Sequence, residues 1–324
     1  MVRSAIARGA VRHPWTRMAE TGMAETDGTA RWQSGAFAIE AAPEHGGSIV
    51  QITWRSPDGP RGLFRPPRAP LATARPSDLG MFLMAPFTNR IDAARLPFDG
   101  AVLDLPLNRP AEHCSIHGFA RDRPWRVDAG GPDEFRMVLD AGEPWGPYRC
   151  QVALTARADG EALVLRLAVT NAGERRLPFG FGFHPWFAFE AGATLDFAAA
   201  ARIAVGDRGL PLAEGAVAAI APGTLGSGRP AEPPAPCDLH FAGWAGTARI
   251  AYPTLGYDLA ITATPNLGNL QVYVPPDRSA FCVEPVSHCV DVANRRDLAA
   301  HGDMTTVEPG ATLAGEMRLA PTPA

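Results

Sequence analysis

The stretch EALVLRLAVTN, Glu161–Asn171, alternates apolar side chains with a period of two. Leu163, Leu165 and Leu167 would share one face of an extended chain, because successive side chains of a β-strand point to opposite sides. The preceding YRCQVALTARADG alternates in the same way and ends in Ala-Asp-Gly, which is a turn signal. Residues 148–170 therefore predict a β-hairpin with one face against a hydrophobic core.

The same pattern recurs along the chain. GAFAIEAAPEHGGSIVQITW, residues 35–54, predicts a second hairpin that turns around Pro43–Gly47. TARIAYPTLGYDLAITAT, residues 247–264, predicts two strands with a turn between them. NLQVYVPPD and FCVEPVSHCV, which follow at 269–277 and 281–290, predict two more strands.

Glycine and proline punctuate the whole sequence. The chain has 33 glycines and 32 prolines, which favours many short strands joined by loops over long helices. We therefore predict an all-β protein, a large antiparallel β-sandwich. Residues 31–324 show no linker-like change in composition and are predicted to form a single domain. Residues 1–30 lack hydrophobic periodicity and predict a disordered N-terminal extension.

The composition excludes several classes of function. A net charge of −4 predicts neither a nucleic-acid nor a membrane partner, and no apolar run approaches the length of a membrane span. All 30 Lys-plus-Arg side chains are arginine. Schiff-base chemistry, a pyridoxal-phosphate lysine and a Walker A lysine are excluded, because each needs a primary amine. The start carries no apolar signal segment, which predicts a cytoplasmic protein.

The cysteines and histidines give little indication of a metal site. The five cysteines are irregularly spaced without a CxxC pair, which predicts free, mostly buried thiols rather than disulfides or structural zinc. His113 and His117 are four apart, a metal-ligand spacing on a helix, but Pro110 and Gly118 argue against a helix there. We therefore expect no metal.

One histidine stands in the most aromatic run of the chain, GFGFHPWFAF, which begins at Gly180. In a strand Phe181 and Phe183 share one face, and His184 lies on the other face with Gly182. The two glycines leave room for something to approach closely. This segment alone fits equally well a hydrogen-bonded core histidine and a titratable group in a functional site.

FCVEPVSHCV supplies a carboxylate in an equally apolar strand. Alternation places Cys282 and Glu284 on one face and Val283 on the other. A glutamate in such a strand is rarely buried unless it is paired or functional. The alternative is a glutamate at a strand end that reaches solvent or an arginine, because Pro285 predicts an edge strand or the end of ladder pairing.

Two further segments add polar groups. Asn89 and Arg90 follow an apolar run, and arginine offers a rigid fork of donors for hydroxyls or carboxylates. The alternative for Arg90 is a surface salt bridge to Asp92. Asp238 lies among apolar residues, with a loop cap as its alternative. No GxSxG, GxGxxG or HExxH motif supports a hydrolase, dinucleotide or zincin site, and carboxylates, arginine and aromatic walls together suit a neutral polyol.

Four short motifs occur in an order that resembles the aldose 1-epimerases, or galactose mutarotases. They are NRI at Asn89–Ile91, HGF at His117–Phe119, HPWF at His184–Phe187 and VEP at Val283–Pro285. The resemblance runs from about Trp32 to the C-terminus, nearly the whole chain. It implies a galactose mutarotase-like β-supersandwich with the sugar in an open cleft, which agrees with the all-β prediction.

The resemblance also implies roles for single residues. His184 matches the family's general acid and Glu284 its general base, and we expect an imidazolium and a carboxylate to stabilise each other's charges. The remaining matches are substrate-binding: Asn89, Arg90, His117, the less closely matching Asp238, and Trp186. Trp186 stands where many members carry tyrosine, so a stacking surface is kept while a hydroxyl is lost.

The function expected from this resemblance is that of an isomerase. It would interconvert the α and β anomers of a free aldohexose such as glucose or galactose by acid–base ring opening and reclosure, without a cofactor. We expect a small-molecule monosaccharide as partner and a monomer or homodimer. One alternative is a mutarotase for a phosphorylated or sulfonated sugar, for which Arg121 and Arg123 could supply cations. Another is a non-catalytic carbohydrate-binding domain.

Overall fold

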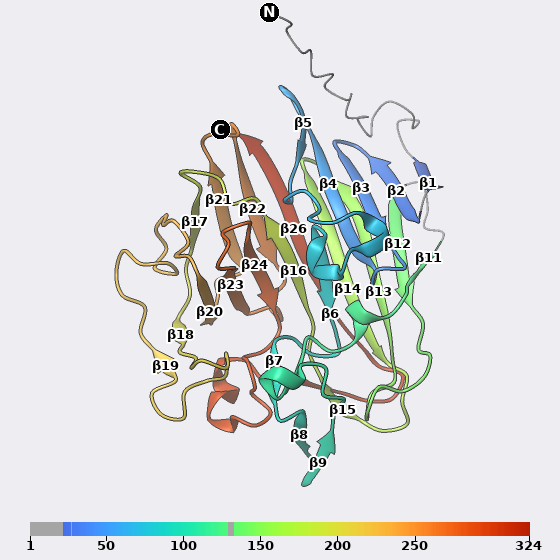
Figure 1. Ribbon diagram of the computed structural model, residues 1–324, viewed down its shortest axis with the longest axis vertical. Helices are drawn as coiled ribbons and strands as arrows, with labels where there is room; N and C mark the ends of the chain where they lie inside the picture. The colour runs from blue at the N-terminus through green and yellow to red at the C-terminus, as the bar shows by residue number, and fades with distance from the viewer. Residues whose placement is uncertain (1–21, 27, 129–132) are drawn as a thin grey trace, which may run out of the picture.

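Two antiparallel β-sheets lie face to face in the computed structural model, which describes residues 22–26, 28–128 and 133–324 (Figure 1). In the described part of the chain the larger sheet has 12 strands. In spatial order they are β1 (Gly22–Thr26), β2 (Thr29–Ser34), β3 (Phe37–Ala42), β4 (Ser48–Ser56), β6 (Met81–Met84), β16 (Gly182–Phe187), β24 (Phe281–Val286), β23 (Asn269–Val274), β20 (Cys237–Ala242), β18 (Ala201–Ile203) and β19 (Val217–Ala218), with β5 (Gly59–Gly62) paired to β4.

The smaller sheet has eight strands among the same described residues. In spatial order they are β11 (Arg126–Asp128), β12 (Glu134–Leu139), β13 (Cys150–Asp159), β14 (Ala162–Asn171), β26 (Thr312–Pro323), β22 (Tyr257–Ala263), β21 (Thr247–Tyr252) and β17 (Thr194–Phe197). Outside both sheets, the residues that the structure describes form three further strand pairs: β7 (Arg90–Asp92) with β10 (Cys114–Ile116), β8 (Arg95–Phe98) with β9 (Ala101–Asp104), and β15 (Leu177–Phe179) with β25 (Thr305–Val307).

Helix is confined to short 3-10 turns in the described residues. They are η2 (Leu71–Thr73), η3 (Pro76–Asp78), η4 (Pro110–Glu112), η5 (Ala120–Asp122) and η6 (Arg296–His301). The predicted all-β class is therefore confirmed. The predicted hairpins are confirmed as well: β13 and β14 pair from Cys150↔Asn171 to Asp159↔Ala162, and β3 turns into β4 around Pro43–Gly47.

The hydrophobic core fills the space between the two sheets. Leu163, Leu165 and Leu167 of β14 are fully buried in it, as their alternation predicts. The larger sheet contributes Trp54, whose ring centroid lies 6.1 Å from that of Tyr257 on the smaller sheet. Burial of these side chains is the main favourable term holding the layers together.

The first described residues overlap the segment 1–30, which the sequence predicts to be a disordered extension. β1 and the first residues of β2 fall inside segment 1–30, where we expect an extension, and they form the outermost pair of the larger sheet. Residues 1–21 and 27 lie outside the described residues. The single domain over 31–324 stays a prediction.

All five cysteines are free, and four of them are buried, as predicted. No helix within the described ranges is long and apolar enough to cross a membrane.

Candidate active site

Four neighbouring strands of the larger sheet, β6, β16, β24 and β23, each place one side chain in a row across the sheet. His184 pairs with Phe82 on one side, and Glu284 pairs with Gln271 on the other. On β16 and β24, Gly182 pairs with Val286 and Trp186 pairs with Cys282. This register sets His184 opposite Glu284. The histidine and the glutamate are therefore cross-strand neighbours, although they lie far apart in the sequence.

Each of these two strands carries a proline next to its titratable residue. β24 lies inside the sheet between β16 and β23, so the edge strand suggested by Pro285 is wrong. The end of ladder pairing is confirmed locally, because no pair joins β16 and β24 between residues 182 and 186. Pro185 and Pro285 have no N–H to donate, which explains the interruption.

The two faces of β16 separate the core from the site, as the alternation predicts. Phe183 and Phe187 belong to the main core. His184 and Trp186 lie on the other face with their rings stacked at 5.0 Å, and the ring of Phe82 stacks on His184 at 4.1 Å. The imidazole is thus held against two aromatic rings, which fix its orientation and exclude water from it.

The acid and the base expected from the sequence are in contact. Nε2 of His184 lies 3.3 Å from Oε1 of Glu284, and 8% and 3% of their side-chain surfaces are exposed. Burial lowers the pKa of His184 well below its usual value, and the charge of Arg121 adds to this. Burial raises the pKa of Glu284 well above its usual value, with Asp238 adding to the effect and Arg90 opposing it. Burial therefore favours a neutral pair that holds one proton over the imidazolium–carboxylate pair that the sequence predicts.

His117 is a neutral donor in the same site. The backbone N–H of Asn89 donates to Nδ1 of His117 at 3.1 Å. Burial, followed by the charge of Arg121, lowers the pKa of His117 well below its usual value. The single proton of the neutral ring is then on Nε2, which can donate to an oxygen. Asn89 and His117 have φ values of 53° and 60°, a strained conformation for these residues that the surrounding packing imposes.

Arg90 is fixed by two carboxylates rather than by Asp92, the partner considered from the sequence. Its Nε donates to Glu112 at 2.9 Å and its Nη1 to Asp238 at 3.3 Å. Asp92 pairs instead with Arg208 at 2.6 Å. With 16% of its side chain exposed, Arg90 presents a preorganised guanidinium to the site.

Asp238 lies on β20 and is not a loop cap. It accepts hydrogen bonds from Arg90 and from the amide of Gln271. Gln271 in turn interacts through its Oε1 with Nδ1 of His240 at 2.9 Å. This chain of side chains holds the Asp238 carboxylate, about a third exposed, at the rim of the site.

All seven predicted site residues line one pocket of about 350 Å³, at the lower end of the usual range for ligand pockets. The sequence did not single out the other lining residues Arg75, Ser77, Phe82, Arg109, Glu112, Ile116, Gln271 and Tyr273. Gln271 and Tyr273 alternate in a predicted strand, but only the strand order shows that their face is that of Glu284. Arg121 also lines the pocket, whereas Arg123 does not, and His113 is exposed.

Three ligand-type atoms of the site come close enough for a metal ion. Those of His184, Cys282 and Glu284 lie within 4.8 Å of one another. Burial raises the pKa of the Cys282 thiol well above its usual value, whereas the thiolate is the form that binds metal. Binding of a cation there would therefore require release of the thiol proton.

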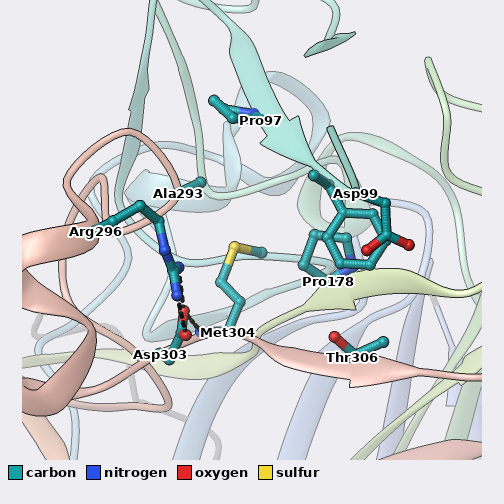
Figure 2. A pocket seen from close by; sticks show the side chains of 9 residues that line it. Pro97, Asp99, Pro178, Ala293, Arg296, Asp303, Met304 and Thr306 are labelled. Carbon is teal, nitrogen blue, oxygen red and sulfur yellow. Dashed lines mark hydrogen bonds and ion pairs between the residues drawn. The ribbon is translucent and has the colours of Figure 1, made fainter. Parts of the chain in front are cut away.

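A second pocket, of about 250 Å³, lies near β8, β15 and β25 (Figure 2). Its charged side chains are already paired. Arg296 donates to both carboxylate oxygens of Asp303 at 2.7 and 2.6 Å, and Asp99 accepts from Arg176 at 3.0 Å. This pocket offers no unpaired acid or base, unlike the pocket around His184.

The chain resembles known proteins in sequence and in structure. The model of the aldose 1-epimerase family matches residues 35–320. The chain is 27% identical over 282 residues to the uncharacterized protein YphB of Escherichia coli (strain K12), which corresponds to 84% of this chain and 92% of that protein.

Two solved structures are similar over nearly the whole chain. A protein from Escherichia coli K12, named for its resemblance to aldose 1-epimerases, superposes with a TM-score of 0.80 at 26% identity, over 94% of this chain and all of that one. A galactose mutarotase-like protein from Clostridium acetobutylicum superposes with a TM-score of 0.77 at 16% identity, over 94% and 99% of the two chains. The second similarity concerns the fold alone.

Proposed function

The chain belongs to the aldose 1-epimerase family, and on that premise we propose that it interconverts the α and β anomers of a free aldohexose such as glucose or galactose. Membership of this family makes the protein an isomerase. The proposal keeps the predicted partner, a small-molecule monosaccharide, and the predicted cytoplasmic location.

The observation that carries the proposal is the contact between Nε2 of His184 and Oε1 of Glu284 at 3.3 Å. The ring oxygen and the anomeric hydroxyl of a sugar are both bonded to C1. An acid on one and a base on the other must therefore lie close together. A buried pair that shares one proton meets this requirement, because it contains one donor and one acceptor.

The reaction starts once the shared proton has moved from Glu284 to Nε2 of His184, which leaves Glu284 as a carboxylate, and it uses this proton in a closed cycle. Glu284 removes the proton from the anomeric hydroxyl while His184 protonates the ring oxygen, and the bond between C1 and that oxygen breaks. The product is the open-chain aldehyde. Rotation about the C1–C2 bond presents the other carbonyl face, and the two proton transfers then run in reverse, so no proton or electron is gained or lost.

The remaining pocket residues bind and orient the sugar in this proposal. His117 donates from Nε2, and Arg90 donates from a guanidinium held by two carboxylates. Both can stabilise the negative charge that develops on a sugar oxygen during ring opening. Asp238 accepts from sugar hydroxyls, and Trp186 forms an apolar wall against the C–H face of the ring.

The test is a substitution that removes only the base. Glu284→Gln keeps the shape of the side chain, and we expect it to lower enzymatic anomer exchange about 10²- to 10⁴-fold, the usual contribution of a positioned acid or base. Polarimetry of freshly dissolved α-D-glucose and α-D-galactose, with the spontaneous rate subtracted, measures this.

His113→Gln is the matched control, because His113 is exposed and outside the pocket. It should retain the wild-type rate. Full activity of the Glu284→Gln variant would contradict both the role of Glu284 as the base and the proposed mechanism.

A non-catalytic carbohydrate-binding domain explains the site less well. A binding protein has no use for an imidazole and a carboxyl buried in contact, since desolvating both costs free energy. For the alternative of a phosphorylated or sulfonated sugar, Arg123 donates to the backbone oxygen of Glu143 at 2.7 Å and stacks on Phe119, away from the pocket. Arg121, by contrast, lines the pocket.

A further inference from the structure

We infer that Arg121 forms a subsite for a carboxylate at C6 of the sugar, which makes a hexuronate the preferred substrate class. The inference rests on the proposed anomer interconversion and narrows its substrate. The observation that carries it is a largely buried guanidinium, directed at the pocket, whose hydrogen-bonding capacity is unused.

Arg121 is under-partnered compared with the other arginines of the pocket. It has no hydrogen bond to any described residue, only 17% of its side chain is exposed, and its Nε is buried. Its one ion pair is a 3.7 Å contact with the half-exposed carboxylate of Asp122. Arg90, which is equally buried, has carboxylate partners within hydrogen-bond distance, while Arg75 and Arg109 are mostly exposed to water. A buried N–H donor without a partner is costly, and so is a largely buried cation with no anion within hydrogen-bond distance, which a bound anion would offset.

The backbone holds Arg121 at this place. It lies in η5, where the N–H groups of Phe119 and Ala120 both donate to the oxygen of Ala85 at 3.0 and 3.1 Å. A Cβ atom on Gly46, which has a φ of +68°, would lie 1.9 Å from the backbone oxygen of Arg121. The segment is therefore packed tightly from the hairpin side, and the side chain belongs to a built site.

The position of Arg121 relative to the acid selects C6. Its guanidinium lies 4.9 Å from the ring of Phe82, the ring that stacks on His184. In the proposed mechanism His184 acts on the ring oxygen. That oxygen is bonded to C5, and C5 carries C6. The exocyclic carbon of an aldohexose therefore lies on the His184 side of the pocket, which is the side of Arg121.

The opposite end of the pocket differs in charge. The groups that act on Glu284 are Asp238 and Arg90, which are paired with each other. Arg90 also pairs with Glu112, so the side of the pocket beyond Glu284 has no unpaired cation among the described residues and suits neutral hydroxyls. The His184 side carries Arg121, whose carboxylate neighbour Asp122 lies beyond hydrogen-bond distance at 3.7 Å, and it suits an anionic substituent.

The type of anion follows from the number of pocket arginines that are largely buried and have no hydrogen bond. A planar carboxylate accepts two parallel hydrogen bonds from one guanidinium. A phosphate monoester has up to two charges and three oxygens, and would require more cations than one. Arg75 and Arg109 are mostly exposed to water and have carboxylate neighbours at 3.2 and 3.6 Å. Arg121 is therefore the one largely buried arginine of the described pocket without a hydrogen bond, and a single guanidinium matches a carboxylate.

The experiment compares sugars on the wild type and on Arg121→Gln. Exchange of anomers, followed by polarimetry or NMR exchange spectroscopy, gives kcat/KM for galacturonate, glucuronate, galactose, glucose and the two hexose 6-phosphates. We expect the wild type to prefer the uronate over the matching neutral hexose at least about tenfold. Arg121→Gln should lower that uronate-to-hexose ratio about 10- to 100-fold, chiefly by raising KM for the uronate. This factor corresponds to the loss of a charge-assisted hydrogen bond.

Arg123→Gln is the matched control, because Arg123 belongs to the same segment but lies outside the pocket; its ratio should equal that of the wild type. Arg121→Lys should restore part of the preference. Circular dichroism and thermal melting establish that each variant is folded. A wild-type ratio near one, or a ratio that Arg121→Gln leaves unchanged, overturns the carboxylate subsite, and a preference for the 6-phosphate over the uronate overturns the choice of anion.

The failure of this inference can be told apart from failure of the proposed function. If the wild type exchanges the anomers of no sugar, the proposed reaction is wrong. Calorimetric titration with galacturonate and galactose then still tests the subsite, because wild-type protein should bind the uronate more tightly and Arg121→Gln should not. Equal binding of both sugars by the wild type would contradict it.

Discussion

At the scale of single residues, two opposing effects decide the charge of the His184–Glu284 pair. The attraction between unit charges 3.3 Å apart is about 5 kcal/mol at an effective dielectric constant of 20. Desolvation costs several kcal/mol for each of the two buried ions. The second effect is larger, in agreement with the lowered pKa of the histidine and the raised pKa of the glutamate, for both of which burial is the first cause.

The pH dependence of kcat/KM follows from these directions. The active free enzyme holds one proton on the pair. The second proton binds only as pH falls through the lowered pKa of His184, and the first is lost only as pH rises through the raised pKa of Glu284. We therefore predict a broad plateau across neutral pH that falls at both the acid and the alkaline end. Initial rates of anomer exchange between pH 4 and 10 measure it, and a single step near the usual histidine pKa would contradict the neutral pair.

At the scale of the element, Gly182 of β16 and Gly180 just before the strand allow neighbouring segments to pack closely. The sequence indicates that Gly180 and Gly182 leave room for a close approach, and the groups that approach are the protein's own. A Cβ atom on Gly180 would lie 2.1 Å from the ring of His288, and one on Gly182 would lie 2.9 Å from the backbone oxygen of Pro285. The space is used for packing neighbouring segments, while the substrate pocket lies over the side chains of the strand.

Gly180→Ala tests this packing. The added methyl group would displace His288, whose Nε2 accepts from the backbone N–H of Thr88 at 3.1 Å. We expect a loss of about 1–3 kcal/mol in the free energy of unfolding, the usual cost of overpacking. Urea denaturation measures it. Gly142→Ala is the matched control, because nothing lies within 4 Å of its Cβ position, and equal effects of the two substitutions would contradict the argument.

At the scale of the whole molecule, the core between the sheets and the pocket outside it are separate. Leu165 of β14 is fully buried in the core between the sheets, whereas the site side chains stand on the opposite face of the larger sheet. Stability and catalysis should therefore respond to different substitutions.

Leu165→Ala is expected to lower the free energy of unfolding by about 2–5 kcal/mol, because it leaves a cavity in the core. The neighbouring Arg166→Ala, whose own side chain is exposed, should change it by less than about 0.5 kcal/mol. Denaturant titration gives both values. The rate per folded molecule should stay at the wild-type level in both variants, and a selective loss of kcat in Leu165→Ala would show that core and site are coupled.

Local alternation is a property of the sequence alone, and it determined the all-β class, the hairpins and the face of each strand. It also marked His184 and Glu284, since a polar side chain in an apolar strand is conspicuous wherever the strand lies. The sequence did not determine the strand order β6, β16, β24, β23, β20, because pairing depends on contacts between distant segments. That order brings Phe82 and Gln271 to the dyad, and the packing of η5 against β6 brings Arg121 to the ring of Phe82. Burial, which only the tertiary structure sets, decides that the dyad is neutral.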